Sequence, residues 1–545
     1  MPNLPVRNLG GGGIITDIHP YDLPNNTFSA GVNVRFENGT VMRGPVPQDV
    51  TKFAGEHVDF SPAHLFYIPS VSSGSESLVA VANDYSKILS VVGNTITDVT
   101  PIGISTGDTG DPFSHDFLGN ITYLNRRSNV PLYKSGSALD FAALPAWDSG
   151  WRCTVLRAYK DFLIALNVKK GAVEYPQMVK WSDFVQFGAP PASWDETSTT
   201  NSAGENILNQ MRGAIIDGHV LRDTFMIYGE NEVWAMNYVG GGFVFDFRKR
   251  FDDVGVINTN CVVEIDGKHY VFARNDIIVH DGATKQSIIH GRVKDFIFGG
   301  LVRDLKHLCF VAHNPQLNEI HFAYPSQDRL AGFGKTTTGC NRIAAYNYRR
   351  DTWTFYDVPN VTSSTHAVVA NGITYEDTAP ASYEEYGGTY AGEANQNERH
   401  QLFTIRKDTT IGVDDNRIVG FSPPTGSLLA RPVLTSLVKD AFVERTGIDL
   451  DENSLSIATY KSLLKVYPQV AVRGTGSTVE FQFGANDVSG VEPDWDARRT
   501  FDPRVDYQVD VRRAGRYLGH RLWYTGPADF SYSGFDARMV SRGKR

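Results

Sequence analysis

A Gly-Lys-Thr triplet at residues 334–336 could hold the phosphates of a nucleotide, because phosphate-binding loops use glycine amides and a lysine for that purpose. Such a loop also needs a glycine five residues before Gly334, and that position holds Arg329. A run of four glycines at residues 10–13 could approach a dinucleotide, but it continues into Ile14 without the start of a helix. We therefore expect no nucleotide cofactor.

Residue types that bind metals or act as nucleophiles are present, but not at the spacings that such sites use. The chain has no HExxH, GxSxG or calcium-loop sequence. The 14 histidines are scattered, and these five have no partner histidine or cysteine at ligand spacing: His19, His64, His280, His321 and His520. The four cysteines form no Cys-x-x-Cys pair, so we expect reduced and buried thiols at Cys153, Cys261, Cys309 and Cys340. We expect no metal site.

Glycoside hydrolysis needs two carboxylates that meet in space, and these can come from any part of a chain. With 61 Asp and Glu residues, no pair can be singled out from this sequence. We therefore expect no enzyme activity and no catalytic residues. A receptor-binding or glycan-degrading role is the alternative.

The composition further restricts the class of protein to which this chain can belong. Aromatic residues make up 12% of the chain and accompany 51 glycines and 26 prolines, which is typical of short strands joined by tight turns. The formal net charge of −9 argues against DNA binding through overall positive charge, because such binding depends on Lys and Arg. The N-terminus lacks the apolar core of a signal peptide, and no apolar run approaches about 18 residues. We expect neither secretion by the usual route nor a membrane-spanning segment.

The expected elements are almost all strands. Where an Asn-Gly or Asp-Gly pair separates two alternating segments, a hairpin is predicted, as at residues 32–43 and 262–273. Units of strand, polar turn and aromatic-bearing strand recur at about 40–50 residues, the period of four-stranded propeller blades. Over residues 31–430 this predicts an all-β propeller of about six to eight blades. A stack of β-sandwiches is the alternative, although no linker-like composition interrupts residues 60–370.

The two ends of the chain differ from this repeat body. Residues 1–30 predict an extended arm, because glycines and prolines keep it irregular. Residues 371–400 are polar and glycine-rich and predict a long loop, either a contact element or a disordered insertion. Residues 431–545 predict an antiparallel, sandwich-like β-domain with a basic tail, within which residues 434–445 could be a helix or a strand.

Several passages together resemble the tail proteins of podoviruses, the short-tailed bacteriophages. The resemblance touches most of the chain and rests on these passages: residues 13–24, 31–44, 225–234, 255–257, 266–282, 346–353, 515–519, 533–536 and 543–545. Its motifs are strand and turn patterns and contain no catalytic signature.

The resemblance implies a nozzle or tail tubular subunit. Such proteins form a hexameric ring below the portal and adaptor proteins, with β-propellers projecting around a channel through which genomic DNA passes. They retain the packaged DNA and support tail fibres or a needle, as structural parts of the virion tail that are made in the host cytoplasm. We expect acidic residues along the channel to repel phosphate. The N-terminal arm and the C-terminal domain would contact neighbouring subunits, with Arg516 and Arg521 as candidate interface residues.

Overall fold

The computed structural model describes these parts of the chain: residues 3–49, 60–69, 76–92, 95–107, 109–136, 138, 140–241, 243–328, 332–368, 399–424, 433–449, 459–473 and 478–544. They form many antiparallel sheets, so the all-β prediction is confirmed. In this part of the chain no helix is long and apolar enough to cross a membrane. The long loop expected at residues 371–400 lies outside the described residues, apart from its last two positions.

Five four-stranded antiparallel sheets follow one another, each with its strands in chain order. The first contains β8 (Pro62–Ile68), β9 (Ser77–Ala82), β10 (Ile88–Val92) and β11 (Thr95–Asp98). The second contains β12 (Phe113–Leu118), β13 (Ile121–Arg126), β14 (Leu132–Ser135) and β15 (Ala142–Ala143). The third contains β16 (Trp151–Tyr159), β17 (Phe162–Lys170), β18 (Val173–Trp181) and β19 (Gly204–Ile207). The fourth contains β20 (Ile215–Leu221), β21 (Thr224–Gly229), β22 (Val233–Tyr238) and β23 (Phe245–Phe251). The fifth contains β24 (Val262–Ile265), β25 (Lys268–Phe272), β26 (Ile277–His280) and β27 (Lys285–Ser287).

The sixth sheet has seven strands. Their order is β28 (Phe310–Asn314), β29 (Glu319–Tyr324), β30 (Cys340–Asn347), β31 (Thr352–Val368), β32 (Arg399–Ile405), β33 (Arg417–Ser422) and β7 (Val46–Asp49). Between the fifth and sixth sheets lie α2 (Lys294–Gly300) and the 3-10 segment η1 (Arg303–Leu308), and η2 (Thr409–Ile411) precedes β33.

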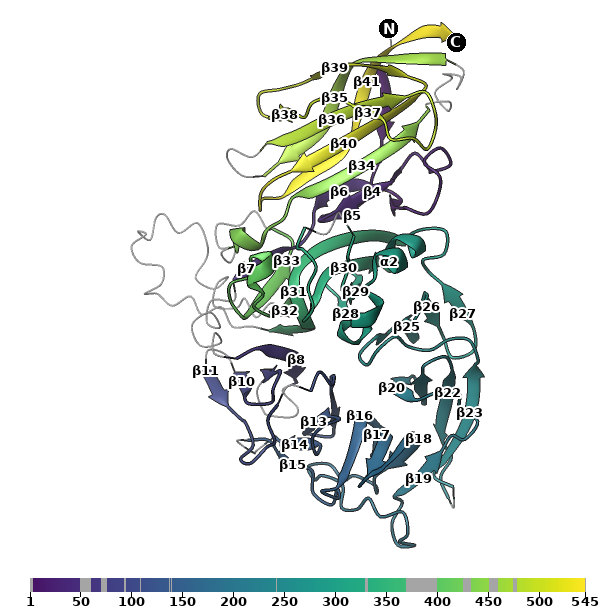
Figure 1. Ribbon diagram of the computed structural model, residues 1–545, viewed down its shortest axis with the longest axis vertical. Coiled ribbons are helices and arrows are strands. Elements are labelled where there is room, and N and C mark those ends of the chain that lie inside the picture. Colours follow the sequence, from purple (N-terminus) through teal and green to yellow (C-terminus); the bar gives the residue numbers. More distant parts are fainter. Residues whose placement is uncertain are drawn as a thin grey trace, which may run out of the picture.

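These six sheets surround a common axis (Figure 1). The first strand of each sheet contacts the first strand of the next, and β31 of the sixth sheet contacts β8 of the first, which closes the ring. Neighbouring sheets pack through apolar side chains, for example Phe66 against Phe113 and Ile164 against Phe225. At the closure, Leu65 of the first sheet and Leu402 of the sixth share one cluster.

The remaining strands form a terminal unit of two six-stranded sheets beside the ring (Figure 1). One sheet contains β39 (Val509–Gly515), β35 (Thr459–Val472), β41 (Phe530–Lys544), β6 (Thr40–Arg43) and β5 (Val34–Glu37), with β1 (Asn3–Arg7) paired to β41. The other contains β37 (Asp494–Trp495), β36 (Val479–Asn486), β40 (Tyr517–Tyr524), β34 (Ala441–Ile448) and β4 (Ala30–Val32), with β38 (Arg499–Phe501) paired to β36. A short parallel pair, β2 (Gly13–Ile14) and β3 (Thr27–Phe28), and the 3-10 segment η3 (Thr435–Leu437) complete the elements.

Domain membership at the N-terminus differs from the boundaries expected from the sequence. The segment 3–7, within the expected arm, is a strand of the terminal unit. Residues 34–43, assigned from the sequence to the repeat body, form β5 and β6 and join β41. The alternating pattern of a hairpin specifies its two faces but not which distant sheet edge it joins.

The local turn predictions hold. Asn38 and Gly39 both have positive φ, at 50° and 77°, and so do Asp266 and Gly267, at 51° and 70°. Positive φ at both central residues is what a two-residue hairpin turn of type I′ requires. The ambiguous segment at residues 434–445 contains a short 3-10 turn followed by the start of β34.

The long connection between β18 and β19 is tied to the third sheet by charge. The ammonium groups of Lys170 and Lys180 both lie within hydrogen-bond distance of the carboxylates of Glu196 and Glu205. Both ammonium groups also stand over the Trp151 ring, at 4.7 and 4.8 Å from its centroid. This arrangement holds the pKa of Glu196 at about 2, because the lysines outweigh the effect of burial.

Candidate functional site

The joint between the ring and the terminal unit is organised by Asn33, a buried residue between β4 and β5 with φ of 58°. Its N–H donates to the carbonyl of Phe355 at 2.7 Å, and its Oδ1 accepts from the N–H of Asp357 at 2.8 Å, both in β31 of the ring. Its Nδ2 donates to the carbonyl of Asp440, at the start of the terminal unit's β34 region, at 2.9 Å. A single side chain thus connects the two parts of the molecule.

Arg43 is a buried cation at the same joint. Its guanidinium donates to three carbonyls, those of Asn33 at 2.8 Å, Lys439 at 2.6 Å and Gly526 at 3.2 Å. Burial lowers the pKa of Arg43 to about 10, and the nearby Tyr524, Asp440 and Asp529 only partly oppose this. At neutral pH the side chain is still charged, and it fixes three backbone segments at one point.

The apolar core is continuous across this joint. One cluster of buried residues contains Phe272 and Phe322 of the fifth and sixth sheets together with Phe36 and Phe481 of the terminal unit. Phe296 of α2 stacks edge-on against Phe355, with ring centroids 4.7 Å apart. The ring and the terminal unit therefore share a core and form one continuous packed body.

The N-terminal arm is anchored by a second buried arginine. Arg445 of β34 donates from Nη1 to the carbonyl of Pro20 at 3.0 Å and from Nη2 to that of Leu23 at 2.8 Å. Burial lowers the pKa of this guanidinium to about 10. A side chain at Gly447, which has φ of 73°, would overlap the backbone of Pro20. The segment around residues 20–23 is consequently held against the terminal unit by both hydrogen bonding and shape.

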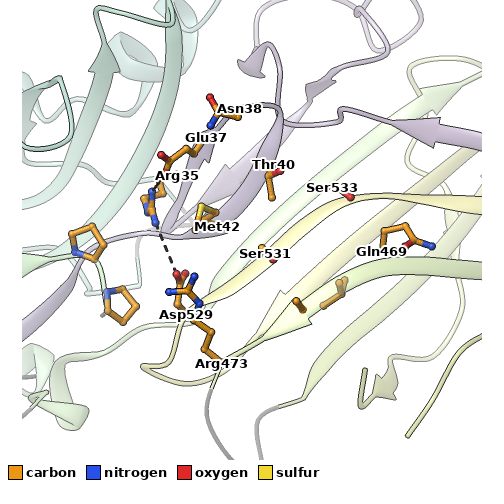
Figure 2. Close-up of a pocket in the computed structure, with 14 residues that line it drawn as sticks. Arg35, Glu37, Asn38, Thr40, Met42, Gln469, Arg473, Asp529, Ser531 and Ser533 are labelled. Carbon is orange, nitrogen blue, oxygen red and sulfur yellow. Dashed lines mark hydrogen bonds and ion pairs between the residues drawn. The ribbon is translucent and has the colours of Figure 1, made fainter. Parts of the chain in front are cut away.

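A cavity of about 800 Å³ lies at the edge of the joint (Figure 2). Its floor is the outer face of the sheet β35-β41-β6-β5, where Met42 lies among small or polar side chains: Thr40, Gln469, Ala471, Ser531 and Ser533. Arg35 lies at one side, 3.9 Å from the carboxylate of Asp529. Burial raises the pKa of Asp529, while Arg35 opposes the rise. The cavity offers polar contacts but no convergent pair of reactive groups.

A second polar site lies on the axis of the ring. Arg157 of β16 binds Asp217 of β20 through Nε at 3.1 Å and Nη2 at 2.9 Å, and its Nη2 also donates to Oδ1 of Asn260 at 3.1 Å. Nδ2 of Asn260 then donates to the carbonyl of Phe113 at 2.8 Å. Asn260 leads into the fifth sheet and Phe113 belongs to the second, which stand opposite each other in a ring of six. These bonds therefore cross the axis.

The titratable groups on the axis differ in charge because their surroundings shift their pKa values differently. Burial alone would raise the pKa of Asp217, but the charges of Arg157 and His219 hold it well below its ordinary value. Nearby, His64 and His115 share a hydrogen bond of 2.9 Å between ring nitrogens. Burial and the charge of Arg157 lower the pKa of His64 to about 3, so this histidine pair is neutral near pH 7. A cavity of about 490 Å³ opens above the network and is lined from all six sheets.

A buried chain of polar groups links the fourth and fifth sheets. The Tyr228 hydroxyl lies 2.6 Å from Nδ1 of His269 and 2.7 Å from Nε2 of His280. Nε2 of His269 donates to the carbonyl of Val220 at 2.8 Å, so its Nδ1 accepts from Tyr228. Burial lowers the pKa of His269 to about 3 and that of His280 to about 4. All three groups are satisfied while neutral, which is a structural arrangement.

An exposed aromatic surface lies on the rim of the third and fourth sheets. Its five side chains are each more than half exposed: Phe184, Phe187, Tyr238, Val239 and Phe243. Two of them lie beside Phe162, whose ring centroid is 6.3 Å from that of Phe184 and 6.0 Å from that of Tyr238. Exposed apolar groups that gather in one place mark contact surfaces more often than isolated ones do. We call this set the rim aromatic surface.

The two candidate interface arginines have different surroundings. Arg521 of β40 pairs with Glu444 at 2.5 Å and Glu492 at 3.3 Å, and its guanidinium lies 3.9 Å from the centroid of the Trp495 ring. It is committed to contacts within the chain. Arg516 stands at the turn between β39 and β40, where its carbonyl accepts from Lys461 at 2.9 Å. A role for either residue between subunits stays a prediction.

The other chemistry-bearing residues take structural roles. The Thr336 hydroxyl donates to the carbonyl of Gly339 at 2.7 Å, within its own turn. All four cysteines are buried and outside disulfides. Among the residues that the structure describes, no group of three or more His, Cys, Asp or Glu side chains is placed to hold a metal ion.

Asn33, Arg43 and Arg445 were missed by sequence reasoning, although they make the joint and the arm contacts. Arg43 and Arg445 lie in strands and Asn33 lies between two strands, all within segments where a polar residue is ordinarily read as facing solvent. The only available signal was Asn33 itself, because Asn tolerates positive φ better than its valine neighbours.

The chain matches no protein-family model and no curated protein. Among solved structures it is similar to the computationally designed Ika8 protein, with 10% identity, coverage of 65% of this chain and 93% of that chain, and a TM-score of 0.34. It is also similar to YCF48, in a structure of YCF48 bound to D1 peptide, with 10% identity, coverage of 55% and 82%, and a TM-score of 0.31. At these TM-scores the likenesses carry no argument.

Proposed function

We propose that this chain is a structural subunit of a bacteriophage tail nozzle, and that several copies, six by the resemblance to podovirus tail proteins, form a ring around the path of the DNA. In this proposal it is not an enzyme. It belongs to the virion tail, assembles in the host cytoplasm, and contacts portal or adaptor proteins on one side and tail fibres or a needle on the other. The rigid joint at Asn33, which bonds to β31 of the ring and to Asp440 of the terminal unit and whose carbonyl accepts from Arg43, is the observation that carries the proposal.

A propeller arrangement of the six sheets would suit this role. We interpret the ring of six sheets as a six-bladed β-propeller, with β28 to β31 as the sixth blade and β32, β33 and β7 as its extension toward the terminal unit. Propellers tile sheets radially and leave short, protected edges, which gives a stiff body without a deep catalytic cleft. A body of this kind suits a part whose task is to keep its shape under load.

The joint transmits force between the two parts. A hydrogen-bonded residue that contacts both parts, a buried cation with three carbonyl partners and a shared apolar core leave no hinge at this position. Hinges in proteins are a few loop residues that absorb large backbone changes, and Asn33 is the opposite case because its backbone and side chain are both bonded. A subunit of a pressurised channel needs such a fixed connection.

The axis of the propeller does not provide the DNA path. Bonds from Asn260 to Arg157 and to Phe113 cross it, and only a cavity of about 490 Å³ lies above them. In our proposal the DNA channel is therefore enclosed by several copies of the chain, with the propellers outside it. The net charge of −9 would let DNA pass through that channel without adhering.

The rim aromatic surface is the propeller's candidate attachment point for another tail component. Aromatic side chains are enriched at the centres of protein interfaces, where they bury large area at low entropic cost. Phe187 and Phe243 are the most exposed members, at 75% and 84%. In this role they would be covered in the assembled tail.

Cryo-electron microscopy of purified phage particles tests the proposal. We expect density for this chain in a closed ring at the tail, with the propellers outside the channel and the rim aromatic surface against another component. Absence of the chain from the particles would overturn the proposal. Release of reducing sugar from host surface polysaccharide by the purified chain would instead favour the glycan-degrading alternative.

A further inference from the structure

The cavity on the axis of the ring has the size and the wall of a site for a small molecule. Its volume of about 490 Å³ lies within the range of about 300–1,000 Å³ that small-molecule sites occupy. His115 and Asp116 of β12 line it and are only partly buried, so they offer polar atoms to a molecule inside it. We call this space the axial cavity.

Both arginines that line the axial cavity already have acceptors within the chain. Arg157 binds Asp217 through Nε at 3.1 Å and Nη2 at 2.9 Å. Arg406 donates from Nε to the carbonyl of Pro62 at 3.1 Å and from Nη1 to that of Thr338 at 3.2 Å. An anion could bind to either guanidinium only at the expense of these bonds, so the arginines do not select a negatively charged ligand.

The histidines that share a hydrogen bond on the axis do not supply positive charge either. Burial lowers the pKa of His115 well below its ordinary value and that of His64 to about 3, so neither ring is a cation near pH 7. Asp116 beside them accepts from the N–H of Phe117 at 2.8 Å and from that of Ala158 at 2.9 Å. Burial raises the pKa of Asp116, but in either protonation state its oxygens keep lone pairs that can accept from a ligand hydroxyl.

The rest of the wall combines neutral hydroxyl groups with apolar groups. The hydroxyls belong to Thr338, Thr362 and Ser364. The partly exposed apolar side chains are Ala63, Pro112, Leu308 and Val311. A sugar ring carries hydroxyl groups around its edge and C–H groups on its two faces, so it matches a wall of this mixed kind.

We infer that the axial cavity binds a neutral, hydroxyl-rich small molecule of the saccharide class, with Asp116 accepting from its hydroxyl groups. The walls belong to the sheets of a closed ring, so the cavity exists before the ligand arrives and little of the chain must be ordered on binding. This inference goes beyond the proposed structural role and does not depend on it. A tail subunit with such a site would also hold a sugar of the host surface.

Saturation-transfer NMR on the full-length chain tests the inference with these neutral sugars as probes: glucose, galactose, rhamnose and N-acetylglucosamine. We expect saturation of at least one sugar. Asp116→Asn exchanges the acceptor carboxylate for an amide, and Ala63→Phe fills the cavity from β8. Each should weaken binding about tenfold or more, which is the effect of losing one hydrogen bond to a charged group. Asp223→Asn, at a carboxylate that is 92% exposed between β20 and β21, is the matched control and should leave binding unchanged.

Several results would overturn the inference. One is no saturation of any of these sugars up to the limit of their solubility. Another is binding that survives both cavity variants, because the sugar would then lie elsewhere. Displacement of the sugar by inorganic phosphate or by choline is a third, because the cavity would then select an ion. Thermal unfolding shows which variants fold, and where one does not, the other decides.

The outcome is separable from that of the proposed function. If particle images show the ring but no sugar binds, the inference fails and the proposed function stands. If a sugar binds in the axial cavity but the chain is absent from particles, the proposed function fails and the inference stands.

Discussion

Replacing Arg43 by methionine should loosen the joint between the ring and the terminal unit. The substitution removes a guanidinium that donates to three carbonyls in a buried position and leaves those carbonyls without their donor. Each lost charged hydrogen bond that leaves its acceptor unsatisfied lowers the free energy of unfolding by about 1.5–3 kcal/mol. Removing the buried charge also removes its desolvation cost, which raises the free energy of unfolding by several kcal/mol. We expect a net loss of about 3 kcal/mol in the free energy of unfolding.

Differential scanning calorimetry and urea unfolding measure this effect. We expect the wild-type chain to unfold with the ring and terminal unit coupled, and Arg43→Met to separate a lower-temperature transition of the terminal unit from that of the ring. Arg43→Lys should lose about 2 kcal/mol, because one ammonium group cannot reach three carbonyls in the geometry of a guanidinium fork. Arg512→Met, at an exposed residue of β39, is the matched control and should change stability by less than about 0.5 kcal/mol.

A particular result would refute the reasoning. If Arg43→Met unfolds at the same urea midpoint as the wild type and as a single transition, Arg43 does not support the bonds through which Asn33 connects the terminal unit to β31 of the ring. If both Arg43→Met and the Arg512 control lose the same stability, the effect is one of general surface charge and not of the joint.

Three further predictions concern the ring. The pKa of Glu196 falls from an ordinary value of 4.5 to about 2 in the folded chain. Its contribution to stability is therefore present above pH 4.5 and is lost as the pH falls toward 2. Urea unfolding across that window should show this pH dependence in the wild type and not in Glu196→Gln. Burial lowers the pKa of His280 to about 4, so this side chain is neutral in the folded chain near pH 7. The free energy of unfolding should therefore decrease as the pH falls from about 6.5 to 4, by up to about 1.4 kcal/mol per pH unit for this group. His280→Gln should flatten that slope. Asn260→Ala should cost about 2 kcal/mol by opening the bonds across the axis, whereas the exposed Asn209→Ala should cost nearly nothing in the same assay.

Local features of the fold were predictable because they depend on adjacent residues. Asn-Gly and Asp-Gly pairs tolerate the positive φ that a two-residue turn requires, and both predicted hairpins are present. The all-β class followed from the same turns and from the aromatic-rich strands between them. No helix-forming period competes with them over most of the chain.

The partners of the N-terminal strands were not predictable in this way. β4 pairs with β34, and β6 pairs with β41, across more than 400 residues of sequence. Pairing at this separation depends on how the ring returns the chain to its starting point, and a strand carries no local signal for a partner so far along the sequence. The buried polar residues of the joint share this limit, because Asn33 and Arg43 become buried only when the distant strands arrive.

The chain path explains why the joint can be rigid. The ring begins just after β6 and returns through β33, which pairs with β7, so its entry and exit lie together next to the terminal unit. The ring is thus an insertion between β6 and β34, in a unit whose strands come from both ends of the sequence, and two covalent connections reinforce the contacts of Asn33 and Arg43. Deleting residues 1–43 would remove strands from both sheets of the terminal unit at once. The two connections and the shared apolar core together hold the ring in one orientation relative to the terminal unit.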